Sequence, residues 1–228
     1  SFFGELRGQG DVVVLRGRCY ERESVPYKAF DGMLEELAAR LSLLGDDELT
    51  RLLPVWIAEL AQVFPVLAQS PAVAARLTGA EPVSAVELRR RALAALRQLL
   101  GNLAAQQPLL LEIDDLQWVD ADSAALLLKL LEAPTPRLLL ALSFRPREAA
   151  VNPALTPYLQ RLAGLPGGRV VSIDVGPLDG AETVELARQT LLSLALPETL
   201  VPTIAAESAG IPFFVEELAR DAAERGGK

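Results

Sequence analysis

Two adjacent carboxylates, Asp114 and Asp115, directly follow the apolar run PLLLEI at residues 108–113. Such a run predicts a buried strand, and in an α/β sheet ligands bind beyond the carboxyl ends of the strands. Neighbouring carboxylates repel each other unless a cation or hydrogen-bond donors stabilise them. Mg²⁺ carrying nucleotide phosphates is such a cation, and the second carboxylate could orient or deprotonate an attacking water. The alternative is that Asp115 caps the next turn and Asp114 is solvated.

The composition limits the chemistry that the chain can perform. Its 228 residues include no histidine and a single cysteine, Cys19, which excludes Ser-His-Asp catalysis, His-ligated zinc and an internal disulfide. Without a histidine to activate it, Cys19 is expected to be a small buried apolar residue. The net charge of −8 and the pI near 4.8 argue against a nucleic-acid surface.

The sequence shows no sign of a membrane span or of a secretory signal. No apolar stretch reaches the roughly 18–20 residues that a span requires. The first ten residues, SFFGELRGQG, lack a basic region followed by an apolar core and a cleavage site. We therefore expect a cytoplasmic protein with no direct contact to membranes.

Apolar runs of strand length alternate with helical patterns over roughly the first 175 residues. This alternation predicts a parallel sheet with right-handed crossovers. Three helices are expected between the first two strands, and the third should begin at Ser84, which forms an S-x-x-E capping box with Glu87. The helix that follows Asp115 should begin at Asp122 or Ser123. The predicted strands are residues 11–21, 108–113, 137–144 and 168–175.

Beyond GPLDG at residues 176–180 the pattern becomes purely helical, with helices expected at 181–194, 197–208 and 212–224. The sequence therefore predicts an α/β core over residues 1–175, with a helical insertion at about 28–106. A helical subdomain should occupy residues 176–228.

The segment LLLEIDDLQWVDADSAALL resembles the Walker B region of STAND-type ATPases, a signalling branch of the AAA-like P-loop NTPases. The family pattern is an apolar strand, then DDLQWAD, then a helix that begins with serine. The resemblance implies that Asp114 coordinates Mg²⁺ and that Asp115 is the catalytic base. Gln117, Trp118 and Asp120 complete the signature.

Two later segments resemble the same family in the same order. LLLALSFRPRE at 138–148 is similar to a strand that ends in TYRPxE, which implies that Arg145 is the sensor-1 arginine near the γ-phosphate. The alternative is a surface ion pair with Glu148. AAESAGIPFFVEELAR at 205–220 resembles the GNPLFLEEL segment of the helical lid, so Gly210 and Pro212 would lie against the adenine. The alternative there is a plain helix–turn–helix.

Near the other end of the chain, LRGRCYERESVPYKAFDGML at 15–34 is closest to ATPase domains of bacterial multidomain proteins. In these the domain is fused to Ser/Thr protein kinases, adenylyl cyclases or LuxR-type regulators. Arg18 and Glu21 could lie either on the nucleotide side or at a packing interface. The implied partners are nucleotide and other domains of the same polypeptide.

The glycine-rich phosphate loop of this family, G-x-x-x-x-G-K-[ST], does not occur in the 228 residues. Residues 1–9 resemble the tail of the helix that follows the loop. In the family the loop-bearing strand lies between the strands predicted at 137–144 and 168–175, so a central sheet position should be open and should favour self-association. We expect a fragment of a longer protein that binds Mg²⁺ and ATP when intact, and weak or no ATP binding by these residues alone.

Two other functions remain open. The missing loop is compatible with a non-enzymatic interaction module that retains the ATPase fold, although charges at strand ends speak against it. A metal-dependent phosphatase or nuclease could use Asp114 and Asp115. It would need further carboxylates or histidines at the other strand ends, which offer Arg16, Arg145 and Asp174 instead.

Overall fold

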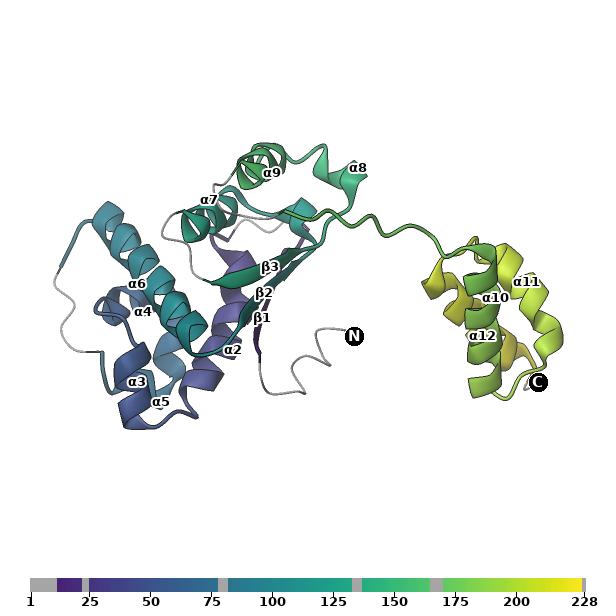
Figure 1. Ribbon diagram of the computed structural model, residues 1–228, viewed down its shortest axis with the longest axis horizontal. Coiled ribbons are helices and arrows are strands. Elements are labelled where there is room, and N and C mark those ends of the chain that lie inside the picture. Colours follow the sequence, from purple (N-terminus) through teal and green to yellow (C-terminus); the bar gives the residue numbers. More distant parts are fainter. Residues whose placement is uncertain (1–11, 22–24, 78–81, 133–136, 165–169, 227–228) are drawn as a thin grey trace. The chain divides into compact units, whose positions relative to one another are not determined.

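The computed structural model describes residues 12–21, 25–77, 82–132, 137–164 and 170–226 (Figure 1). The helix tail suggested for residues 1–9 therefore lies outside the described residues. The chain divides into two compact units, Ser1–Val170 and Val171–Lys228, each with its own apolar core. The sequence predicted the boundary between the α/β core and the helical subdomain near Gly176, a few residues after the observed division.

The first unit contains a parallel sheet in the order β1-β2-β3, with strands β1 (Val13–Arg18), β2 (Leu109–Asp114) and β3 (Leu138–Leu142). Three of the predicted strands are confirmed. The register pairs Arg18 with Asp114 and Leu142 with Ile113, so the carboxyl ends of all three strands meet at one edge of the sheet. This edge is where the sequence placed the two carboxylates.

The fourth predicted strand is not observed. Residues 168 and 169 lie outside the described residues, and residues 170–175 have no regular secondary structure. Their apolar side chains are exposed, from 57% at Val170 to 93% at Val175. The strand prediction was therefore wrong for residues 170–175. Their alternating apolar pattern permits a strand, but a strand forms only where a neighbouring strand pairs with it.

The segment between β1 and β2 is helical, as expected. Its second predicted helix is interrupted at Pro54, which has no backbone N–H to donate. Ser84 accepts a hydrogen bond from Glu87 N at 3.2 Å, whereas the Glu87 carboxylate bonds Arg90 and Arg91, so half of the predicted capping box forms. The elements are η1 (Lys28–Phe30), α2 (Asp31–Leu41), α3 (Asp46–Leu52), α4 (Ile57–Val63), η2 (Pro65–Gln69), α5 (Pro71–Ala74) and α6 (Ala85–Gln106).

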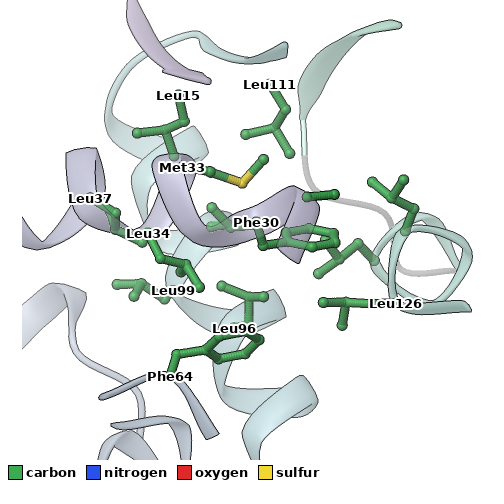
Figure 2. Close-up of a cluster of buried hydrophobic side chains, with 14 of the residues drawn as sticks. Leu15, Phe30, Met33, Leu34, Leu37, Phe64, Leu96, Leu99, Leu111 and Leu126 are labelled. Carbon is green, nitrogen blue, oxygen red and sulfur yellow. The ribbon is translucent and has the colours of Figure 1, made fainter. Parts of the chain in front are cut away.

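Helices cover one face of the sheet and form the main core. Figure 2 shows side chains of α2 and α6 packed beneath Leu15 of β1 and Leu111 of β2. Phe30, Met33 and Leu34 are fully buried there, and burial of each such side chain contributes about 1.5–3 kcal/mol. On the opposite face, Arg16 and Glu112 form an ion pair at 2.8 Å.

Short elements connect β2 and β3 to the rest of the unit. They are η3 (Leu116–Trp118), α7 (Ala121–Leu131), α8 (Pro146–Ala149) and α9 (Leu155–Ala163). Asp120 caps α7 by accepting a hydrogen bond from Ser123 N at 2.8 Å. The predicted start at Asp122 or Ser123 was therefore slightly late.

The second unit is a small helical bundle of α10 (Gly180–Ser193), η4 (Glu198–Leu200), α11 (Val201–Glu207) and α12 (Pro212–Gly226). Asp179 and Glu182 form a reciprocal capping box at the start of α10. The side chains of Ala187, Leu191 and Val215 form the centre of its core. Within the part of the chain that the structure describes, no helix is both long and apolar enough to cross a membrane.

Candidate functional site

The two carboxylates lie at the carboxyl edge of the sheet, on consecutive residues with different backbone conformations. Asp114 is the last residue of β2, and Asp115 adopts a left-handed conformation with φ 55° and ψ 40°. Aspartate tolerates this region better than most residues. The turn leads the chain from β2 into η3, and the Asp115 side chain makes no capping bond to that helix.

Ser143, which follows β3, holds both acidic residues. Its hydroxyl donates a hydrogen bond to Asp114 Oδ1, and the Asp115 N–H donates to the same hydroxyl at 3.3 Å. The Ser143 N–H donates to Ile113 O at 3.1 Å, so the pairing of β2 and β3 continues into the site. Sequence reasoning assigned no role to Ser143, although the parallel register of the strands would have placed it beside Asp114.

Both carboxylate oxygens of Asp115 accept hydrogen bonds. Arg18 donates to Oδ2 through Nε at 3.0 Å and Nη2 at 2.7 Å, and Gln117 Nε2 donates to Oδ1 at 3.0 Å. Partial burial raises the pKa of Asp115, but the bonds from Gln117 and Arg18 and the charges of Arg18 and Arg145 lower that pKa below its ordinary value. Arg18 therefore contacts Asp115 beyond the end of β2.

Gln117 connects Asp115 to the segment after β3. Its side chain is buried, and its Oε1 accepts a hydrogen bond from the Arg145 N–H at 3.1 Å. The backbone of Arg145 is therefore fixed beside the acids. Its guanidinium is 69% exposed and contacts Glu148 at 3.2 Å, which is the ion pair that the sequence left as an alternative.

A pocket of about 380 Å³ adjoins Asp114 on the β1 side of the sheet. Arg16, Arg18 and Lys28 contribute three cationic side chains to its lining. Two of these pair with acids of the same pocket, since Arg16 contacts Glu112 at 2.8 Å and Lys28 contacts Asp31 at 2.7 Å. The pocket thus provides open space next to Asp114, lined by three cationic and four acidic side chains.

Gly210 and Pro212 lie in the second unit, in the turn between α11 and α12. Gly210 has φ +76°, and its carbonyl accepts a hydrogen bond from Leu178 N at 2.8 Å. A Cβ at this position would lie 2.4 Å from Leu178 O, so the close approach requires glycine. Pro212 begins α12, where its missing N–H costs nothing.

The oxygen donors at this site suit a Mg²⁺ ion only if a bound nucleotide and water supply most of its coordination. The described residues contain no group of three or more acidic, histidine or cysteine side chains placed to hold a metal. Mg²⁺ in nucleotide sites uses one or two carboxylates, with phosphates and water completing its shell. Asp114 is half-exposed and uses Oδ1 for Ser143, so its Oδ2 could take this role.

The parallel sheet, the helices between its strands and the two acids at the carboxyl end of β2 define an α/β protein. This arrangement is consistent with the core of a P-loop type of ATPase. A family model described as "AAA ATPase domain" matches residues 1–142, and the chain belongs to that family. The match includes all three strands and the Asp114–Asp115 turn, whereas Arg145, Gly210 and Pro212 lie beyond it. No curated protein and no solved structure matched the chain.

Proposed function

We propose that this chain is the nucleotide-hydrolysing domain of a STAND-type signalling ATPase. The observation that supports this most is the grouping of Asp114, Asp115, Gln117 and Ser143 at the carboxyl edge of a parallel sheet. Ligands of α/β proteins bind at that edge. All but Ser143 lie in the segment that the AAA ATPase domain family model matches.

In this proposal Asp114 holds Mg²⁺ and Asp115 acts on the attacking water. The ion, when bound, would neutralise charge on the phosphates. Ser143 fixes the Asp114 carboxylate, while Arg18 and Gln117 fix that of Asp115. Arg145 would pair phosphate oxygens, which suits its planar guanidinium. Its exposed contact with Glu148 is no obstacle, because exposed ion pairs contribute little to stability.

The remaining parts of the site would come from elsewhere in the polypeptide. No G-x-x-x-x-G-K-[ST] sequence occurs in the 228 residues, so the backbone that binds the phosphates must be supplied by another segment. The Gly210–Pro212 turn would lie against the adenine. The intact protein would be a bacterial kinase-like or regulator-like protein whose ATPase domain has two arrangements. Nucleotide would bind these two arrangements with different affinity and so switch a partner domain between states.

The metal role of Asp114 can be tested in a polypeptide that also carries the phosphate loop. We expect Mn²⁺, a paramagnetic substitute for Mg²⁺, to broaden the NMR signals of residues 113–116 when titrated together with ATP. Asp114→Asn should abolish this broadening. Asp47→Asn, which removes an exposed carboxylate on α3, should leave it unchanged. Broadening that persists in Asp114→Asn, or that is centred elsewhere, would contradict the assignment.

The role of Asp115 requires turnover. In a polypeptide that also carries the phosphate loop, Asp115→Asn should retain ATP binding and lose hydrolysis, because the metal and phosphate contacts remain. Unchanged hydrolysis in that variant would refute the role given to Asp115. Micromolar affinity of the 228-residue chain for ATP would refute the need for a separate loop.

A further inference from the structure

A polar side chain beyond the segment that the family model matches connects two parts of the site. Asn152 lies between α8 and α9, and its Nδ2 donates hydrogen bonds to the carbonyl oxygens of Gln117 at 2.8 Å and Val119 at 3.1 Å. Its Oδ1 accepts a hydrogen bond from the Ala154 N–H at 2.9 Å. A side-chain amide has two N–H donors and one carbonyl, so each of these groups has a partner. Asn152 therefore joins η3, which follows β2, to the segment that follows β3.

This arrangement fixes the orientation of two side-chain amides. The carbonyls bound by Asn152 can only accept hydrogen bonds, so its NH₂ group must face them. The Arg145 N–H can only donate, so Gln117 turns its Oε1 toward that group at 3.1 Å. The Gln117 Nε2 is then left to donate to Asp115 Oδ1 at 3.0 Å. Gln117 is thus held at both its backbone and its side chain, with its donor facing Asp115.

The η3 turn that carries Gln117 is short and benefits from hydrogen bonds made from outside it. Helices of the 3₁₀ type have poor hydrogen-bond geometry and few bonds of their own at this length. Backbone hydrogen bonds of 3.0 Å close the turn at Trp118 and at Val119. Gln117 and Val119 are buried, and a buried carbonyl without a hydrogen bond destabilises a fold. Asn152 satisfies both carbonyls with one side chain, so it fixes the turn that begins at Asp115.

We propose that Asn152 is a positioning residue for ATP hydrolysis, which acts through Gln117 on the carboxylate of Asp115. This role rests on the proposed function, in which Asp115 acts on the attacking water. The segment at 145–152 also carries Arg145, which in that function pairs phosphate oxygens. By joining this segment to η3, Asn152 fixes the backbone of Arg145 relative to the acid that acts on the water.

The expected effect is on turnover rather than on nucleotide binding. The link through Asn152 contains no residue proposed to hold the metal or the adenine. Without this link Gln117 would lose its fixed orientation, and Arg18 would remain as a donor to only one oxygen of Asp115, Oδ2. The carboxylate could then turn away from the water, and a misplacement of about 1 Å can slow a reaction by about 100-fold.

The test uses a polypeptide that also carries the phosphate loop. Asn152→Asp replaces the donating NH₂ group by an oxygen and keeps the acceptor for the Ala154 N–H. We expect kcat for ATP hydrolysis to fall about 10- to 100-fold with little change in KM. Hydrogen exchange at the Arg145 amide should become at least about tenfold faster, because Gln117 Oε1 no longer holds its proton. Asn152→Ser, which shortens the reach to η3 without adding a charge, should show the same pattern at smaller amplitude.

Asn102 provides a matched control, because its side chain makes the same kind of contact in another part of the unit. Asn102 of α6 donates to the carbonyl oxygens of Arg51 at 3.5 Å and Leu52 at 2.9 Å. Asn102→Asp therefore also removes bonds between a side-chain amide and the backbone. It should leave kcat and the exchange rate of the Arg145 amide unchanged. An equal fall in kcat in Asn102→Asp would indicate general destabilisation and would overturn the role of Asn152.

The same measurements separate the role of Asn152 from the proposed function. Normal hydrolysis by Asn152→Asp, where Asp115→Asn is inactive, would overturn the role of Asn152 alone. An Arg145 amide that exchanges at its original rate in Asn152→Asp would do the same. Normal hydrolysis by both variants would overturn the proposed function, on which that role depends.

Discussion

Gly17 is the residue at which the packing of the site can be perturbed most sharply. It lies in β1 between Arg16 and Arg18, and a Cβ built on it would be 2.0 Å from the backbone oxygen of Ala29 in η1. Ordinary contact begins near 3.4 Å. Gly17→Ala therefore requires a backbone shift of about 1 Å or more between two packed elements.

The cost of that shift can be estimated from the structure. The residue after Ala29 is Phe30, which is fully buried in the main core, so η1 cannot retreat without disturbing that core. Overpacking of this kind typically costs about 1–3 kcal/mol. The small intrinsic advantage of alanine in a strand offsets at most about 1 kcal/mol of it. Since a backbone oxygen cannot rotate away, we expect the upper end of that cost and a net loss of about 2 kcal/mol.

Tryptophan fluorescence during thermal unfolding measures this loss in the first unit alone. Both tryptophans, Trp56 and Trp118, belong to that unit. For a unit of this size a loss of about 2 kcal/mol corresponds to a fall in Tm of about 4–8 °C. Gly101→Ala in α6 is the control, because nothing lies within 4 Å of its Cβ and alanine favours the helix. A Gly17→Ala variant as stable as the unchanged chain would refute the reasoning.

Two further predictions address the second unit and the acid range. Gly210→Ala should destabilise the second unit by about 1–2 kcal/mol, which lowers the Tm of helix unfolding measured by circular dichroism. The unfolding transition followed by tryptophan fluorescence should not move. Gly176→Ala is the control and should change neither transition. Arg90 and Arg91 lower the pKa of Glu87 to about 2, so its carboxylate stabilises the fold above the ordinary pKa and loses this effect as the pH falls toward 2. Glu87→Gln should therefore be less stable to urea than the unchanged chain at pH 7, and the difference should vanish near pH 2; a difference that is constant with pH would contradict the assigned ion pairs.

The sequence predicted the elements that carry the two acids because their signals are local. An apolar run that ends in Asp114 predicts a strand and its carboxyl end, and the helical periods on either side predict crossovers. Strand order then brings the ends of β1, β2 and β3 together. Cys19 also followed expectation, since burial raises the pKa of its thiol to about 12.

Features that depend on partners distant in sequence were not predictable in the same way. The contact between Arg18 and Asp115 joins residues 97 positions apart and depends on the register of β1 and β2. Residues 170–175 carry the alternation of a strand, but a strand exists only where another one pairs with it. The sequence pattern shows that a segment can form a strand, whereas the presence of a neighbouring strand determines whether the strand forms.

Asp115 is where the geometry constrains the proposed chemistry most. An efficient general base needs a pKa near the working pH, yet the bonds from Arg18 and Gln117 hold the pKa of this carboxyl below its ordinary value. A carboxylate held in this way is a weak proton acceptor but a well-fixed hydrogen-bond acceptor. Phosphoryl transfer demands little of a base, because its transition state is largely dissociative and positioning provides most of the rate. In the proposed function the arrangement therefore favours Asp115 as the residue that orients the attacking water, with proton removal following rather than driving bond cleavage.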